Sequence, residues 1–183
     1  YPDVAAARTG ESTPWVRSLD GTWEFAVAPS PEAVDWGRAD WGRTDVPGSW
    51  VLPGSVDSEG GRPAYTNVVM PFPDEPPAVP ADNPTGMYRR SFRVPSAWRG
   101  RRVLLEVGSA DVAVEVWCNG TWVGFGTDSR LASTFDLTPH LRRGANELGL
   151  AVPRWAASSW LEDQDQWWLP GLHRSVRLIS VGD

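Results

Sequence analysis

The chain has 183 residues, the size of one domain, and 41% of them are hydrophobic, enough for a core despite 18 glycines and 17 prolines. Its net charge of −6 would repel phosphates, which argues against a nucleic-acid partner and favours a neutral ligand. The single cysteine, Cys118, excludes an internal disulfide and favours a reducing, cytoplasmic location. We see no signal peptide and no apolar run of membrane-spanning length, so no membrane partner is expected.

The chain begins with polar, irregular residues 1–17, which we interpret as an N-terminal arm leading into one domain over residues 18–183. A turn and a strand follow over 19–27, where apolar and polar residues alternate as in a half-buried strand. Residues 29–41 are rich in Pro, Gly and Asp and predict loop or a short helix. A brief edge strand is expected over 45–50, because a proline there cannot donate to a central ladder.

A loop-rich stretch occupies residues 54–86. Residues 65–70 form an extended island within it, and residues 71–84 carry too many prolines for a helix. A long loop inside a compact domain is more often functional than decorative.

The signal for strands is strong in the second half of the chain. Alternating segments fall over 87–94, 103–107, 112–117, 133–137, 146–152 and 175–181. Asn119-Gly120, between Trp117 and Trp122, predicts a two-residue type I′ hairpin. Residues 138–142 predict a single helical turn, and no apolar repeat of helical period is sustained. Closely spaced strands without intervening helices predict an all-β fold, an antiparallel sandwich or jelly roll.

Most common catalytic motifs are missing from the sequence, including a phosphate loop, an HExxH helix and a Gly-x-Ser-x-Gly elbow. The two histidines, His140 and His173, lack a metal-ligand spacing, and we interpret both as structural or surface residues. The richest chemistry lies in an acidic segment that contains Glu162, Asp163 and Asp165. Tryptophans flank it at Trp155, Trp160, Trp167 and Trp168, within a chain that has 12 in all.

Several interpretations of this acidic segment remain open from the residues alone. Two of its carboxyl groups would act as an acid–base pair for glycoside hydrolysis if they stood about 5–5.5 Å or 6.5–9.5 Å apart. Its oxygens also suit a hard cation. As a sugar-binding loop, it would use carboxylates for the hydroxyls and an indole for the apolar face of the ring. The plainest alternative is a solvated loop held in place by its tryptophans, and binding and this alternative both rank above catalysis.

Seven segments in this order resemble one known family. They are Ser18-Leu-Asp-Gly-Thr-Trp-Glu-Phe25, Tyr65-Thr-Asn-Val68, Asp82-Asn-Pro-Thr-Gly-Met-Tyr88, Trp117-Cys-Asn-Gly-Thr-Trp-Val-Gly-Phe-Gly126, Asp128-Ser-Arg130, Phe135-Asp-Leu137 and Leu161-Glu-Asp-Gln-Asp165. Together they resemble the N-terminal domain of the large bacterial β-galactosidases of glycoside hydrolase family 2, from about Ser18 to the end of the chain. The resemblance implies a jelly-roll, galactose-binding-like fold that abuts a catalytic (β/α)₈ barrel.

The resemblance also assigns roles to individual residues. Asn67 and Asp165 match positions that face the galactosyl group, and Asp165 is further expected to ligate sodium. The catalytic glutamates and the magnesium ligands of the family belong to the barrel, whose motifs are absent here, so we expect this chain to be inactive alone. Glu162 and Asp163 are then expected to shape the loop, and the tryptophans beside them to hold it in place. The chain departs from the family pattern at Gln166, where methionine is common, and at His173, where phenylalanine is often found.

These implications lead to one principal expectation with two alternatives. We expect a fragment of a retaining β-galactosidase whose partners are a lactose-like β-galactoside and the barrel of its own chain, in a parent that forms a homo-oligomer. The first alternative is an autonomous carbohydrate-binding module that captures sugars on exposed tryptophans. The second is a structural domain that serves barrel docking and subunit assembly.

Overall fold

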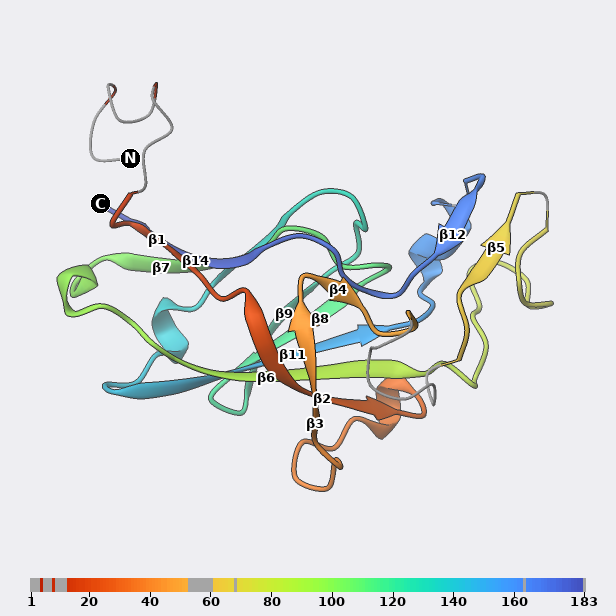
Figure 1. Cartoon of the computed structure of the whole chain (residues 1–183), viewed down its shortest axis with the longest axis horizontal. Coiled ribbons are helices and arrows are strands. Elements are labelled where there is room, and N and C mark those ends of the chain that lie inside the picture. The colour runs from red at the N-terminus through yellow and green to blue at the C-terminus, as the bar shows by residue number, and fades with distance from the viewer. Residues whose placement is uncertain are drawn as a thin grey trace.

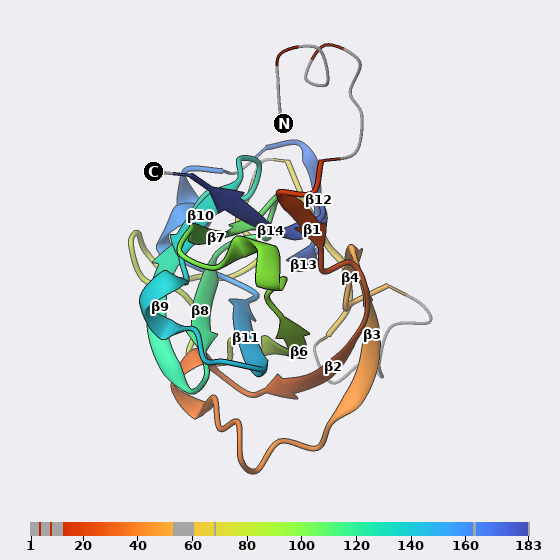
Figure 2. The same cartoon turned by 90° about the vertical axis from the view of Figure 1, so that its left-hand side faces the viewer.

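The computed structural model describes residues 13–52, 61–67, 69–162 and 164–182, together with Val4 and Arg8. These residues form two antiparallel sheets packed face to face (Figures 1 and 2). In spatial order, the four-stranded sheet contains β1 (Val16–Ser18), β14 (Val176–Val181), β7 (Arg102–Val107) and β10 (Ser133–Asp136). The six-stranded sheet contains β3 (Gly42–Val46), β2 (Gly21–Ala28), β6 (Thr85–Arg93), β11 (Ala145–Pro153), β8 (Val114–Cys118) and β9 (Thr121–Gly126). The predicted antiparallel jelly-roll sandwich is confirmed.

Two further two-stranded ribbons complete the described strands. One pairs β4 (Gly48–Ser49) with β13 (Gly171–Leu172), and the other pairs β5 (Ala64–Thr66) with β12 (Gln166–Trp168). Single 3-10 turns connect the elements at η1 (Pro31–Ala33), η3 (Ser96–Trp98), η4 (Thr138–His140) and η5 (Ala157–Trp160). No helix within the described part of the chain is long and apolar enough to cross a membrane.

The main core fills the space between the two sheets. The six-stranded sheet contributes Phe25 and Tyr88, which meet at 4.9 Å between ring centroids, and also Leu150. Leu105 and Leu178 face them from the four-stranded sheet, and all five are at most 1% exposed. This packing follows from the alternation predicted for these strands, since residues two apart point to the same face of a sheet.

The hairpin predicted at Asn119-Gly120 is confirmed. Cys118 pairs with Thr121, which leaves a two-residue turn between β8 and β9. Asn119 has φ 53° and Gly120 has φ 79°, the two positive values that a type I′ turn requires.

The boundary expected at Ser18 lies too late in the chain. The indole of Trp15 packs against the core, with the Arg101 guanidinium 3.9 Å from its ring centroid, and β1 begins at Val16 and pairs with β14. Residues 15–17 therefore belong to the sandwich, although they were expected in the arm. Residues 16–18 show no alternation of apolar and polar residues that would predict a strand. The strand forms because it pairs with β14, at the other end of the chain.

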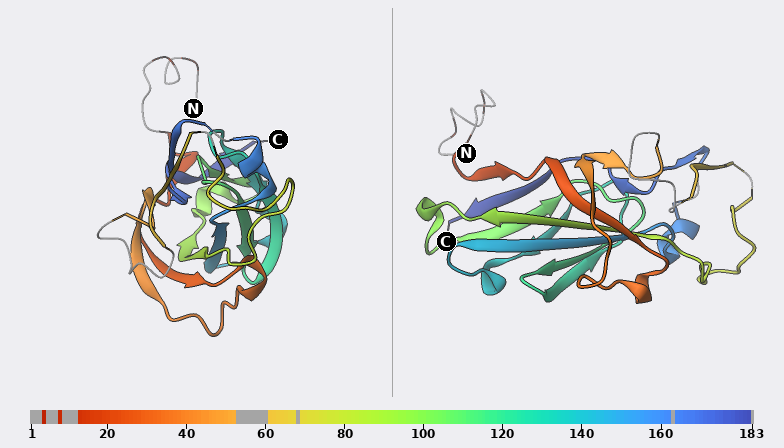
Figure 3. Two further views of the ribbon diagram at one scale, coloured as in Figure 1. Left: turned by 90° about the vertical axis from the view of Figure 1, so that its right-hand side faces the viewer. Right: turned by 60° about the horizontal axis from the view of Figure 1, so that its bottom comes forward.

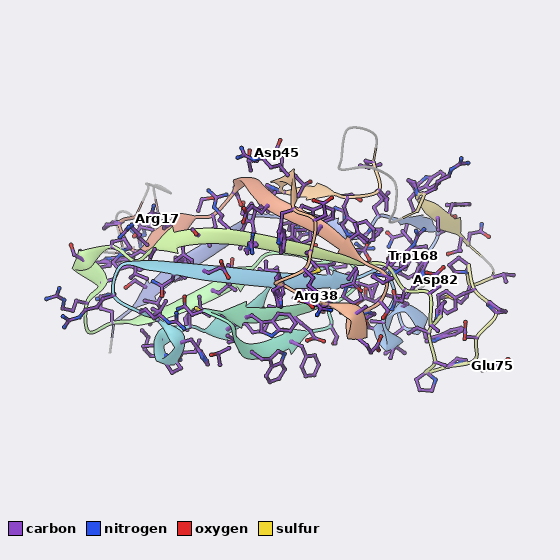
Figure 4. All side chains as sticks on the ribbon, turned by 90° about the horizontal axis from the view of Figure 1, so that it is seen from below. Arg17, Arg38, Asp45, Glu75, Asp82 and Trp168 are labelled. Carbon is purple, nitrogen blue, oxygen red and sulfur yellow. The ribbon has the colours of Figure 1, made fainter. Side chains whose placement is uncertain are left out.

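The two ends of the sandwich differ in what they carry. The β5–β12 ribbon lies at one end, while β1 and the end of β14 lie at the other (Figures 1 and 3). In the side-chain view, Trp168 and Asp82 lie at the ribbon end and Arg17 lies at the opposite end (Figure 4). The loops that bear the predicted site residues are thus gathered beyond one end of the two sheets.

Candidate functional site

The β5–β12 ribbon brings together the two predicted site motifs, which lie about 100 residues apart in the sequence. Its register pairs Ala64 with Trp168, Tyr65 with Trp167 and Thr66 with Gln166. The same register, extended by one residue, sets Asn67 opposite Asp165. The two residues expected to face a galactosyl group therefore lie directly beyond the paired residues of β5 and β12, at the same end of the ribbon.

The ribbon has one exposed and one covered face, because directly opposed residues on antiparallel strands point the same way. Tyr65, Asn67, Asp165 and Trp167 share the exposed face, and all four are exposed. Thr66 and Trp168 lie on the other face and are buried. We call the first set the ribbon face; it presents two aromatic rings, an amide and a carboxylate to one side.

The polar groups of the ribbon face interact directly. The hydroxyl of Tyr65 donates a short hydrogen bond to Oδ1 of Asp165. This bond, with some burial and the charge of Asp165, raises the pKa of Tyr65, while a hydrogen bond with the side chain of Asn67 opposes the rise. The ring of Tyr65 also lies 5.4 Å from that of Trp167, tilted by 46°. The four side chains thus form one connected group.

The covered face is anchored on a small aromatic core. Nε1 of Trp168 donates to Oγ1 of Thr66 at 2.8 Å, which satisfies the only polar atom of the buried indole side chain. Trp168 packs edge to face on Trp155 at 5.3 Å, and Trp155 packs on Phe72 at 5.1 Å. Phe72 in turn packs on Trp160 at 5.2 Å. This cluster holds the ribbon against the end of the sandwich.

The role expected for the tryptophans therefore fits three of the four. Trp155 and Trp168 are buried, and the indole of Trp160 donates to the carbonyl of Ala78 at 2.8 Å. Trp167 does not fit, because 57% of its surface is exposed. The alternation along β12 explains the difference, since adjacent residues of a strand face opposite ways.

The other residues of the acidic segment occupy separate environments. Oε1 of Glu162 accepts a hydrogen bond from the backbone N–H of Ser129 at 3.1 Å. Asp163 lies outside the described residues, as does Val68 of the Tyr-Thr-Asn-Val segment. The amide Nε2 of Gln166 is buried and has no hydrogen-bond partner among the described residues.

Sequence reasoning missed one buried carboxylate near this segment, that of Asp111. It is 3% exposed and lies 4.0 Å from both Nη1 of Arg130 and Nε2 of His173. Burial raises the pKa of Asp111, and the charges of His173 and Arg130 oppose that rise. The available signal was an acidic residue set between Ala110 and Val112 in an otherwise apolar run. The other histidine, His140, is half-buried in η4.

The donors of the ribbon face suit a hard, singly charged cation. Asp165, Asn67 and Tyr65 offer a carboxylate, an amide oxygen and a hydroxyl, all of them oxygen donors. The described residues contain no group of three or more His, Cys, Asp or Glu side chains arranged to hold a metal ion. One carboxylate with neutral oxygen donors would bind a divalent ion weakly. The same donors could supply some of the oxygen ligands of a sodium ion.

The chain shares its fold with solved structures of two bacterial β-glucuronidases. The chain superposes on the β-glucuronidase of Bifidobacterium dentium, complexed with coumarin-3-O-glucuronide, with a TM-score of 0.65 and 23% identity, covering 93% of this chain and 31% of that one. The β-glucuronidase of Ruminococcus gnavus gives a TM-score of 0.68 and 20% identity over 93% and 29%. At this level of identity the likeness establishes the fold alone.

Curated relatives are closer in sequence. The chain is 46% identical over 185 residues to a β-galactosidase of Klebsiella pneumoniae, covering 98% of this chain and 18% of the relative. It is 43% identical over 182 residues to one of Psychromonas ingrahamii, covering 96% and 17%. The chain thus spans less than a fifth of the length of these relatives. The family model "Glycosyl hydrolases family 2, sugar binding domain" matches residues 16–181, and the chain accordingly belongs to glycoside hydrolase family 2 as its sugar-binding domain.

Proposed function

We propose that this domain supplies one wall of the galactosyl pocket of a retaining β-galactosidase, with Asn67 and Asp165 as its sugar contacts. The observation that carries the proposal is the ribbon face, which sets both residues beside each other and beside two exposed aromatic rings. The catalytic glutamates would come from a barrel elsewhere in the same polypeptide, docked on this end of the sandwich. The domain alone would therefore not hydrolyse a galactoside.

The chemistry of the ribbon face matches a neutral sugar. A carboxylate accepts hydrogen bonds from hydroxyls, and charge-assisted bonds of this kind are about twice as strong as neutral ones. An amide such as that of Asn67 both donates and accepts, so it can distinguish the orientation of a hydroxyl. The rings of Tyr65 and Trp167 offer apolar area to the C–H face of a sugar.

The charge of the ribbon face favours a galactoside over a glucuronide. Asp165 is its only charged residue, and it would repel the carboxylate of a glucuronide. This argument agrees with the sequence comparison, in which relatives above 40% identity bear the name β-galactosidase. The β-glucuronidases share the sandwich at 20–23% identity.

Asp165 would also be a sodium ligand in the complete pocket. A sodium ion there would supply a positive charge that holds sugar hydroxyl oxygens. Asp165 would place its carboxylate toward the ion, with one oxygen kept in position by the Tyr65 hydroxyl. Magnesium, by contrast, would be held by residues of the barrel.

The test is the kinetics of the full-length enzyme with Asp165→Ala and Asn67→Ala, measured on a nitrophenyl galactoside across a sodium titration. We expect Asp165→Ala to lower kcat/KM at least about tenfold, the cost of removing a charge-assisted hydrogen bond, and to abolish the dependence on sodium. Asn67→Ala should lower kcat/KM while leaving the sodium dependence in place. Unchanged sodium dependence in Asp165→Ala would rule out the ligand role, and unchanged kcat/KM in both would rule out the wall itself.

A further inference from the structure

Asp111 lies at the junction of three segments that are distant in the sequence. It follows β7 and precedes β8, and its carboxylate is almost fully buried. Arg130 reaches it from the connection between β9 and β10, and His173 from the residue after β13, each at 4.0 Å. Glu162, which follows η5, raises the pKa of Asp111 through its own charge. Among the residues that the structure describes, these three are the charged or titratable groups that face Asp111.

The same residue holds the chain where it leaves the ribbon. Leu169 directly follows β12, and its backbone N–H faces the carboxylate of Asp111 and lowers the pKa of that group, against the effect of burial. Nε2 of His173 makes a short hydrogen bond with the carbonyl of Leu169, and must be the protonated nitrogen because a carbonyl only accepts. The backbones of Asp111 and Gly171 add two reciprocal hydrogen bonds, at 2.9 and 3.2 Å. The stem from Leu169 to Gly171 is therefore fixed on Asp111.

The opposite end of the acidic segment is attached to the same cluster. Glu162 lies three residues before Asp165 and accepts from the N–H of Ser129. The next residue, Arg130, is the one that approaches Asp111. Asp165 thus lies on a segment whose two ends, at Glu162 and at Leu169, are both tied to the surroundings of one buried carboxylate.

Folding stability does not explain a charge at this position. Because burial raises the pKa of Asp111, the folded chain binds a proton there more readily than the unfolded chain. The contribution of this group to stability therefore falls as the pH rises from the ordinary aspartate range through the raised pKa. At neutral pH an uncharged residue of the same shape should fold at least as well, since Arg130 and His173 keep 43% and 28% of their side-chain surface in solvent.

We propose that Asp111 is a positioning residue for the sugar-binding ribbon, and that its ionised carboxylate, with Arg130 and His173, holds the stem at Leu169 so that Asp165 faces the sugar. This inference rests on the proposed function and deepens it. His173, which departs from the family pattern, would have a role in the same arrangement, because it hydrogen-bonds the carbonyl of Leu169. Protonation of Asp111 would remove the negative charge that faces Arg130 and His173, and with it the hold of His173 on Leu169, and would loosen the ribbon.

The test is Asp111→Asn in the full-length enzyme, compared with the native enzyme and with Glu24→Gln. Glu24 forms a surface ion pair with Arg89 at 2.7 Å and lies in β2, away from the ribbon, so Glu24→Gln controls for the loss of one carboxylate. We expect Asp111→Asn to raise KM for a nitrophenyl galactoside about five- to tenfold, because the amide keeps the shape of the carboxylate but loses its charge, without lowering the unfolding temperature at neutral pH. Glu24→Gln should leave KM unchanged.

Two further readouts separate positioning from a merely structural role. The KM of the native enzyme should rise as the pH falls toward the pKa of Asp111, while the KM of Asp111→Asn should already be high and lack that component. His173→Phe, which keeps an aromatic ring but removes the bond to Leu169, should also raise KM. An Asp111→Asn enzyme with native KM and native pH profile would overturn the inference, as would a loss of activity that only accompanies a lower unfolding temperature.

The outcome for Asp165 distinguishes the two proposals. If Asp165→Ala impairs the enzyme and Asp111→Asn does not, the positioning role fails and the proposed function stands. If Asp165→Ala leaves kcat/KM and sodium dependence unchanged, the proposed function fails, whatever Asp111 does.

Discussion

Asp165 is the residue on which most of the chemistry of the ribbon face depends. Its carboxylate accepts from Tyr65 while remaining exposed, so its remaining lone pairs point to solvent where a sugar or an ion would lie. The resemblance to the family predicted Asp165 and Asn67 as sugar contacts, whereas the residues alone marked only the acidic segment and, weakly, the Tyr65-Thr-Asn67 tripeptide. Tyr65 and Trp167 were not singled out as sugar contacts, since only the ribbon register shows that they share the same face.

The link between Tyr65 and Asp165 predicts a measurable change in titration. The hydrogen bond to Asp165 raises the pKa of Tyr65, because losing the phenolic proton would set two negative groups together. We expect Asp165→Asn to lower the pKa of Tyr65 toward that of a free tyrosine. Carbon NMR of labelled tyrosine in this chain suits the measurement, since it contains three tyrosines. A Tyr65 pKa that does not move would show that the contact with Asp165 does not persist in solution.

At the scale of elements, the ribbon is the part that sequence could not provide. β12 has only three residues and directly follows an acidic turn, so it is too short for an alternation of apolar and polar residues to predict it. The extended island predicted over 65–70 marks β5 but not its partner. Both strands exist because they pair with each other and because Trp168 and Thr66 seal the covered face. Longer strands such as β11 were predictable, because apolar residues recur at every second position over several positions of the strand.

The seal of the covered face can be tested by Thr66→Val. This change keeps the shape of Thr66 but leaves the buried Nε1 of Trp168 without its partner, which should cost about 1–3 kcal/mol in the free energy of unfolding. Thr22→Val is a matched control, because it removes an exposed hydrogen bond to Asp45 and should change the free energy by less than about 0.5 kcal/mol. Urea unfolding of the two variants checks both. Equal effects would mean that the indole is not sealed by Thr66.

At the scale of the whole molecule, the jelly-roll fold could be predicted from the sequence. The arrangement of the end of the sandwich that carries the β5–β12 ribbon could be predicted only in part. Alternation, the hairpin at Asn119-Gly120 and the lack of a helical repeat define a sandwich without reference to any relative. The packing of Trp15 against the core and the burial of Asp111 were not predictable, because both depend on contacts between residues that are distant in the sequence. The fold then gathers residues from positions 65 to 67 and 165 to 167 at one end, where a second domain would complete a pocket.

The most direct test of the account is a crystal structure of the full-length enzyme with galactose bound. We predict that the side chains of Asp165 and Asn67 lie within hydrogen-bonding distance, about 3 Å, of hydroxyls of the galactosyl group, directly or through a shared sodium ion. We also predict that the ribbon face points into the mouth of the barrel. A galactose bound in the barrel with the ribbon face turned away from it, and neither side chain in contact, would contradict the proposed function.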